Sequence, residues 1–373
     1  MNGYSVKTRI YPISAQDPDP EIIAIAAQTL LMRGLVAFPT ETVYGLGANA
    51  LDNNAVGRIF EVKQRPFYDP LIVHIASKSQ IEEVARTIPT IAFELAEQFW
   101  PGPLTMVLNR NARVAENVSA GLGTVAVRMP DHRIPLDLII AAGVPVAAPS
   151  ANLFSRPSPT IAQHVVDDLF GNVDIILDGG ACPIGLESTV LDLTGPIPTI
   201  LRPGGTPAEA LKKVLPDLRV TPENKYADEG SAHPSPGMLL KHYSPKAGFI
   251  LCTGDSDNVL ARMREIILGL TAQGKKIGLM TTDEDYPLFS DLPIEIEKLG
   301  SEEDLAEIGQ NLFAGMRRLD KQKVSFILMH AVKSGGLGQA IWDRLYKAAE
   351  QQVIDLDRPL NTDWISRFVN KPR

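Results

Sequence analysis

The first two hundred residues alternate short apolar runs with segments whose apolar residues recur at helical spacing. Spacings of three and four predict helices, and short runs rich in Val, Ile and Leu predict strands. Helices are predicted at 20–34, 53–64 and 88–100. Strands are predicted at 35–40, 70–76, 104–110, 124–130, 144–152, 174–180, 188–193 and 198–204. This order predicts one twisted, partly antiparallel sheet flanked by helices.

A second regular alternation begins after Ala247. Strands are predicted at 248–254, 276–282, 294–300 and 324–332, with helices at 257–273, 302–319 and 338–354. Such a βαβ order predicts a small parallel α/β domain, Rossmann-like in its layers. The intervening stretch is rich in Pro, Gly and charge, although a short helix at 207–215 fits its pattern. We therefore expect a catalytic domain at 1–205, a linker or lid at 206–246 and a C-terminal domain at 247–373.

Composition limits the classes of function. The chain has 373 residues, 45% of them hydrophobic and 21% charged, with a net charge of −8, which is typical of a globular protein. An acidic chain gains nothing from bulk attraction to nucleic acid or anionic lipid. The two cysteines, Cys182 and Cys252, lie far apart and have no metal-ligand spacing. With no signal-like start and no apolar run of roughly 18 residues, a cytoplasmic location is expected.

Candidate chemistry gathers between residues 35 and 75, where two hydroxyl-rich turns, a Lys-x-Arg pair and one histidine occur together. Lys63 and Arg65 either offset the dipole of a helix end or bind phosphate, as Arg does with its planar fork. His74 lies in an apolar strand and is either a core residue or a ligand contact. Alternation puts Thr124, Ala126 and Arg128 on one face of a strand, where Arg128 needs an anionic partner. That partner is either a structural Asp or a substrate carboxylate.

Other loops add hydroxyl groups and glycines. Ser150 and Ser158 lie in one loop whose Ser, Asn and Pro suit either an ordinary turn or phosphate contacts. Ser188 precedes a predicted strand, and Arg202 ends another. The pattern GLGANA at 45–50 is expected to open a helix, but no acidic residue follows at the offset of a dinucleotide fingerprint. A P-loop motif is absent from the sequence.

These residues lie in an ordered series of motifs that resembles the threonylcarbamoyl-AMP synthases, in the long form with a YrdC-type domain before a small α/β domain. The matching motifs are FPTETVYGLGANA, KQRP with DPLIVHI, GTVAVRMP, PSAN, SPT, LESTVLD, LRPG and SPGMLLKHYSP. The tail, with VSFILMHAV and GLGQAIWDRLYKAA, is similar to the C-terminal domain of the family.

The resemblance implies that L-threonine, bicarbonate and ATP form L-threonylcarbamoyladenylate and pyrophosphate, with Mg²⁺ accompanying ATP. A separate transferase complex would pass the threonylcarbamoyl group to tRNA, with no membrane involved and direct tRNA contact left open. The implied threonine contacts are Thr42, His74, Arg128, Ala148 and Ser188. The implied ATP contacts are Arg65, Asp69, Thr124, Ser150, Ser158, Arg202 and Tyr243, with Lys63 beside the phosphates and Lys63 and Arg65 as catalytic groups. The segment 233–243 would cover the labile product.

Two positions depart from the family pattern. Asp69 stands where the family usually has Asn, and a carboxylate there would repel phosphates unless Mg²⁺ or Lys63 intervenes. The loop 152–155 reads Asn-Leu-Phe-Ser in place of the more common N-x-S-G. A double-stranded RNA-binding module without adenylate chemistry is the alternative, and a carbamoyl-transfer module similar to hydrogenase maturation factors is a third.

Overall fold

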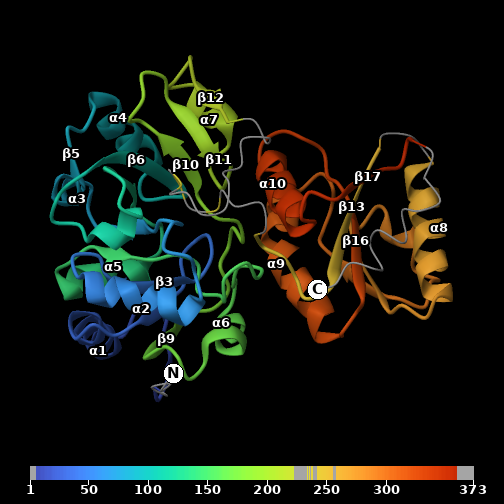
Figure 1. The fold of residues 1–373 in the computed structure, drawn as a ribbon, viewed down its shortest axis with the longest axis horizontal. Coiled ribbons are helices and arrows are strands. Elements are labelled where there is room, and N and C mark those ends of the chain that lie inside the picture. Colours follow the sequence, from blue (N-terminus) through green and yellow to red (C-terminus); the bar gives the residue numbers. More distant parts are fainter. Residues whose placement is uncertain are drawn as a thin grey trace. The chain divides into compact units, whose positions relative to one another are not determined.

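The computed structural model describes residues 6–221, 233, 235, 237, 242–254 and 258–358. The chain divides into a first unit, residues 1–154 and 158–240, and a second unit, residues 155–157 and 241–373. Figure 1 shows the elements of both. No helix in the described part of the chain is both long and apolar enough to cross a bilayer.

The first unit is built on a twelve-stranded mixed sheet. Along the sheet the order is β1-β9-β2-β3-β8-β4-β7-β6-β10-β11-β12, with β5 paired to β6. The bounds are β1 (Arg9–Pro12), β2 (Val36–Phe38), β3 (Gly45–Asn49), β4 (Ile72–His74), β5 (Ala85–Arg86), β6 (Leu104–Arg110), β7 (Thr124–Arg128), β8 (Val146–Ala147), β9 (Ile175–Asp178), β10 (Thr189–Asp192), β11 (Thr199–Arg202) and β12 (Arg219–Val220). The predicted mixed sheet is confirmed.

The helices of this unit lie on both faces of the sheet. They are α1 (Pro20–Leu31), α2 (Asn53–Lys63), α3 (Ile81–Val84), α4 (Thr90–Phe99), α5 (Arg133–Ala142), α6 (Ala162–Leu169) and α7 (Ala208–Lys212). The larger core packs residues of α2, α3, α4, α6 and α7 against one face. On the opposite face, α1 and α5 pack only against the end of the sheet around β2, β8 and β9.

Helix α2 illustrates how local sequence sets these elements. Asp52 caps it, because its side chain accepts from the backbone N–H groups of Asn54 and Ala55. The helix ends at Gln64, which adopts a left-handed conformation with φ of 53°. Arg65 therefore leaves the helix and enters the loop toward β4.

The second unit contains a five-stranded parallel sheet in the order β15-β14-β16-β13-β17, as the predicted α/β pattern requires. The strands are β13 (Gly248–Thr253), β14 (Ile277–Thr281), β15 (Glu295–Lys298), β16 (Phe326–His330) and β17 (Val353–Asp355). The helices are α8 (Val259–Ala272), α9 (Leu305–Lys321) and α10 (Gly338–Ala348). Helix α8 covers one face of the sheet, and α9 and α10 cover the other (Figure 1). Three 3₁₀ turns, at Lys78–Gln80, Glu116–Ser119 and Tyr286–Leu288, complete the described elements.

Two local predictions are wrong. GLGANA does not open a helix, because Gly45–Asn49 form β3, antiparallel to β2, and α2 begins only at Asn53. The helix predicted at 338–354 ends at Ala348, because Val353–Asp355 pair with β13 as strand β17. In both places pairing with a distant strand overrides the local pattern.

The predicted connector contributes to the first unit. Within 206–246, α7 packs on the first core, and β12 pairs in parallel with β11. Most of the predicted cover at 233–243 lies outside the described residues. Of that segment the structure describes His233, Ser235, Gly237, His242 and Tyr243.

Candidate active site

The predicted site residues on β7 lie where alternation puts them. Val125 and Val127 belong to the larger core on one face of the sheet. Ala126 belongs to a small apolar patch on the opposite face, together with Ile72 of β4. The same patch continues across β6 and β10 through Val107 and Val190. Thr124 and Arg128, two residues either side of Ala126, therefore share this face.

Strand register places His74 beside Arg128. The two residues are direct partners in the parallel pair β4–β7. Burial, with the nearby Arg128 guanidinium, lowers the pKa of His74 to about 3, so its imidazole is neutral at physiological pH. Within the described part of the chain its Nδ1 atom has no hydrogen-bond partner. A neutral ring with a vacant nitrogen can accept or donate one hydrogen bond, depending on its tautomer.

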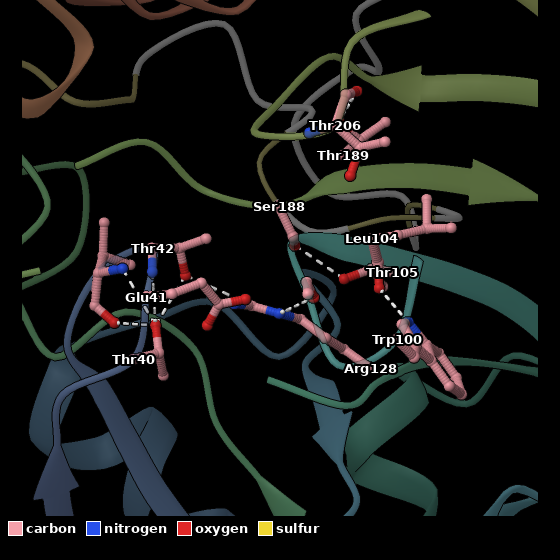
Figure 2. Close-up of polar contacts among 12 residues, drawn as sticks. Thr40, Glu41, Thr42, Trp100, Leu104, Thr105, Arg128, Ser188, Thr189 and Thr206 are labelled. Carbon is pink, nitrogen blue, oxygen red and sulfur yellow. Dashed lines mark hydrogen bonds and ion pairs between the residues drawn. The ribbon is translucent and has the colours of Figure 1, made fainter. Parts of the chain in front are cut away.

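Arg128 is the centre of the polar network in Figure 2. It is only 3% exposed. Its guanidinium lies 2.6 Å from the Glu41 carboxylate and donates to the Thr42 hydroxyl at 2.9 Å and to the Gly102 carbonyl at 3.2 Å. Of the two partners that the sequence left open, a protein carboxylate is thus present here. It comes from a glutamate that the sequence analysis did not single out.

Glu41 lies in the buried turn between β2 and β3. Thr40 stabilises this turn, because its hydroxyl accepts from the backbone N–H groups of Thr42 and Val43 and lies 2.7 Å from the Thr42 hydroxyl. The turn is almost without solvent contact, and Glu41 is 5% exposed. In the sequence Glu41 stands between two threonines like an ordinary turn residue, and no local pattern sets it apart.

A second group of hydroxyls surrounds Ser188, at the entry to β10. The Ser188 hydroxyl lies 2.7 Å from the Thr105 hydroxyl of β6, as Figure 2 shows. Arg202 donates to the Ser188 carbonyl at 2.8 Å and to its hydroxyl at 3.3 Å. Gly204 packs directly beneath, since a Cβ there would come within 2.3 Å of the Ser188 carbonyl carbon. The LRPG motif therefore needs glycine for close backbone approach.

Lys63 and Arg65 are buried rather than extended into solvent. The Lys63 ammonium donates to the backbone carbonyls of Ser150 and Asn152, which fastens the hydroxyl-rich loop to the end of α2. Arg65 donates to the carbonyls of Asp69 and Pro70 at 3.0 and 2.8 Å. Both side chains thus order backbone around the predicted ATP contacts.

Asp69 is held by an arginine and not by Lys63. Its carboxylate forms an ion pair with Arg65 at 2.9 Å, and both side chains are almost fully buried. Burial raises the pKa of Asp69, although the charges of Arg65, His233 and Arg202 act in the opposite direction. These charges place Arg65, Asp69 and Arg202 in one neighbourhood. The sequence analysis names Mg²⁺ or Lys63 as the group that would balance the charge of this carboxylate. In the structure Arg65 balances it.

The remaining predicted contacts are distributed over the same unit, with one exception. The Ser158 hydroxyl donates to Glu187, and both residues are buried. The Ala148 N–H donates to the Ile72 carbonyl at 2.9 Å. Tyr243 is the exception, because it belongs to the second unit, where its ring packs 5.3 Å from that of Phe313.

The second unit has a hollow of its own, of about 980 Å³, at the carboxyl ends of its parallel strands. This edge is the usual place for ligands in open α/β sheets. Its charged lining is mainly acidic and consists of Asp285, Glu302, Asp355 and Asp357, with Lys333 and His330. None of the residues predicted to bind threonine or ATP lines it.

Comparisons with known proteins agree with the two-unit organisation. Residues 28–204 match the family model Sua5_yciO_yrdC, described as telomere recombination. Residues 206–350 match the model of the threonylcarbamoyl-AMP synthase C-terminal domain.

Individual relatives match nearly the whole chain. The threonylcarbamoyl-AMP synthase of Pyrococcus abyssi is 46% identical, over 89% of this chain and 95% of that protein. The synthase of Bacillus subtilis is 42% identical, over 92% of this chain and 96% of that protein. The crystal structure of P. abyssi Sua5 complexed with L-threonine superposes with a TM-score of 0.88 at 44% identity, covering 93% of this chain and 99% of that one. The chain therefore belongs to the threonylcarbamoyl-AMP synthase family, in its long, two-domain form.

Proposed function

We propose that this enzyme joins L-threonine, bicarbonate and ATP into L-threonylcarbamoyladenylate and releases pyrophosphate. The observation that carries the proposal is the buried Arg128 guanidinium beside a neutral His74 and the Thr42 hydroxyl. A cation fixed among hydroxyls and a neutral imidazole suits a small hydroxylated amino acid better than a bulky or strongly anionic ligand. The relative crystallised with L-threonine supports the same choice.

In this proposal Arg128 binds the carboxylate of threonine. Arginine can grip a carboxylate with two parallel hydrogen bonds, and burial strengthens each of them. Thr42, His74 and Ser188 would recognise the substrate hydroxyl and shape the carbamate pocket, with the backbone at Ala148 closing one side. Holding the amine, the carbonate carbon and the α-phosphorus in line would supply most of the catalysis, since neither bond-forming step demands a covalent enzyme intermediate.

The ATP contacts would lie on the side of the site formed by the ends of α2 and β11. Arg65 and Arg202 are the cations available to the phosphates, and Lys63 acts by ordering the Ser150 loop. Ser150, Ser158 and Thr124 would add hydroxyl donors, and Tyr243 stays an ATP contact predicted from the sequence. The neighbouring positive side chains would stabilise negative charge as pyrophosphate leaves. The Asp69 carboxylate would weaken the electrostatic attraction between Arg65 and the phosphates, because it already pairs with this arginine.

Mg²⁺ would enter as part of the MgATP substrate. No group of three or more His, Cys, Asp or Glu side chains in the described part of the chain is arranged to hold a metal. Phosphate oxygens and water would supply ligands to this ion. The product would pass to a tRNA threonylcarbamoyl transferase complex, and a cytoplasmic location stays a prediction from the sequence.

The test is an assay of pyrophosphate release by the purified full chain. Release is expected only when threonine, bicarbonate, ATP and Mg²⁺ are all present, and omission of any one should reduce it to background. Release that continues without threonine would reject the proposal. Salt-dependent binding of double-stranded RNA with no pyrophosphate would support the RNA-binding alternative instead.

A further inference from the structure

Glu41 is a buried carboxylate with an unusual lack of hydrogen bonds. Both of its carboxylate oxygens are inaccessible, and neither accepts a hydrogen bond from any described residue. Its charge is balanced by the ion pair with Arg128 at 2.6 Å. A carboxylate removed from water normally gains several donors, because burial without them is costly. Glu41 therefore has free acceptor capacity at the position where the substrate carboxylate would arrive.

The amino acid substrate of the proposed reaction carries a carboxylate and an ammonium group, both attached to its α-carbon. Its carboxylate competes with Glu41 for Arg128, and its ammonium needs an acceptor of opposite charge. When Arg128 turns to the substrate carboxylate, Glu41 is left buried and ionised without a partner, which is strongly unfavourable. The ammonium, one bond away from the carbon that bears the carboxylate, is the group that can replace Arg128. The Arg128–Glu41 pair thus has the charge pattern of an amino acid zwitterion.

We propose that Glu41 binds the α-ammonium group of the amino acid substrate and accepts its proton. This inference rests on the proposed function, since it needs an amino acid at Arg128. Glu41 would be a catalytic residue in the strict sense, because it touches the reacting nitrogen. It would also select α-amino acids over hydroxy acids of the same shape.

The proton transfer makes the amine a nucleophile. Threonine's ammonium gives one proton to the Glu41 carboxylate, and the N–H bonding pair becomes the lone pair on nitrogen. This lone pair attacks the carbon of carbon dioxide formed from bicarbonate, an N–C bond forms, and one C=O π pair moves onto oxygen. The proton held by Glu41 is the one that bicarbonate takes up as it splits into carbon dioxide and water, and a second N–H proton leaves to water, so that ammonium and bicarbonate give carbamate, water and one proton overall. The Glu41 carboxylate is then restored.

Other groups around Glu41 are poorly suited to this transfer. His74, whose pKa is lowered to about 3, is neutral and carries no negative charge to balance an ammonium. Burial raises the pKa of the Cys182 thiol to about 12, so this neighbour stays protonated. His132, whose pKa burial lowers, uses its Nδ1 atom to cap α5 by accepting from the Ile134 N–H. Arg128, the charged group that pairs with Glu41, is a cation.

The first experiment measures binding, without turnover. Isothermal titration of the full chain would compare L-threonine with 3-hydroxybutyrate, which is threonine without its amino group, for wild type and Glu41→Gln. Wild type should prefer threonine by about 10- to 100-fold, the value of one charge-assisted contact. Glu41→Gln should lose this preference while it binds 3-hydroxybutyrate at least as tightly as wild type, because the internal competitor for Arg128 is gone. A folding defect would weaken the binding of both ligands, so it cannot explain weaker binding of threonine together with undiminished binding of 3-hydroxybutyrate.

The second experiment tests proton transfer by the pH dependence of pyrophosphate release. Glu41→Gln should lower kcat at pH 7 by about 100-fold or more and regain activity toward pH 9, where more free amine is present. Glu41→Asp should keep part of the activity, and Glu97→Gln, an exposed control, should match wild type. Unchanged discrimination and an unchanged pH profile in Glu41→Gln would overturn the proposal. Failure of the proposed function would appear differently, as wild-type protein that releases no threonine-dependent pyrophosphate.

Discussion

The candidate site of the first unit and the hollow of the second unit carry their charged groups in opposite ways. In the candidate site, the cationic side chains are buried, and a carboxylate or carbonyl oxygen of the protein contacts each of them, as with Arg128 and Glu41 or Arg65 and Asp69. In the second unit, carboxylates line an accessible hollow at the strand ends, with Lys333 65% exposed beside it. Buried, paired charge is the costly arrangement, and it is typical of functional sites.

This difference is the reason we propose that the triphosphate and the amino acid bind in the first unit. The second hollow has the position that ligands prefer in parallel α/β sheets, but its acidic lining would repel phosphate. The described part of the first unit instead buries Arg65, Arg128 and Arg202 in a mixed sheet and its loops. Position in a fold therefore suggests a site, while charge and burial decide which ligand can use it.

The largest expected effect comes from Arg128→Ala. The KM for threonine should rise by about 100-fold or more, because the buried contact between the guanidinium and the threonine carboxylate is lost. The KM for ATP should change by less than about threefold. Steady-state kinetics with each substrate varied in turn would measure both. Arg133→Ala removes a neighbouring arginine that is 61% exposed and should match wild type. Equal changes for both substrates would show that Arg128 is not the carboxylate clamp.

Gly204→Ala should have the next largest effect. Its Cβ would meet the Ser188 backbone at 2.3 Å, so the β10 entry must shift, at a cost of about 1–3 kcal/mol in the free energy of unfolding. Chemical denaturation would measure the loss, and the KM for threonine should rise with it. Gly195→Ala is the matched control, because a Cβ at that position meets no atom within 4 Å. Equal stability of the two variants would contradict the close packing of LRPG on Ser188.

His74 should make stability depend on pH. The unfolded protein protonates this histidine below about pH 6.5, whereas the folded protein keeps it neutral down to about pH 3. Its contribution is complete above pH 6.5 and falls as the pH decreases, by up to about 1.4 kcal/mol for each pH unit. Denaturation of wild type and His74→Gln at pH 7, 6 and 5 isolates the effect, with His330→Gln, 30% exposed, as control. Parallel pH curves for all three proteins would exclude it.

A smaller effect is expected from Asp69→Asn. Removing this carboxylate leaves the charge of Arg65 unopposed and should lower the KM for ATP by about two- to tenfold, because Arg65 then attracts the phosphates more strongly. Threonine kinetics should be unaffected. A higher KM for ATP would mean that the ion pair at 2.9 Å holds Arg65 in its working position.

The smallest effect is expected in the second unit. Lys333→Ala changes an exposed side chain that pairs with Glu302 and Glu303 at 3.2 Å. Stability should stay within about 0.5 kcal/mol of wild type, and the kinetics of both substrates should not change. A changed KM for threonine would remove the distinction between the two units.

Sequence reasoning succeeded where one local rule was sufficient. Strand alternation put Thr124 and Arg128 on one face, and the βαβ order predicted the parallel sheet of the second unit. It failed where distant strands meet. The pairing of β2 with β3, and the addition of β17 to β13, override what GLGANA and the 338–354 pattern suggest locally.

Side-chain partners were harder still to predict. Glu41 looks like an ordinary turn residue, and only the folded sheet brings the Thr40–Thr42 turn against Arg128, 86 positions beyond Thr42. Lys63 could equally be a helix-end cation or a phosphate ligand, and the structure shows it binding backbone carbonyls of the Ser150 loop. Which groups a buried charge meets depends on register, and one sequence does not reveal register between distant strands.

The most direct test of the account is a crystal structure of the full chain with L-threonine and a non-hydrolysable ATP analogue. We expect the threonine carboxylate on the Arg128 guanidinium, its nitrogen within hydrogen-bond distance of Glu41, and the α-phosphate facing the same pocket. Threonine bound elsewhere, or an Arg128–Glu41 ion pair that stays closed while threonine and nucleotide are both bound, would contradict it.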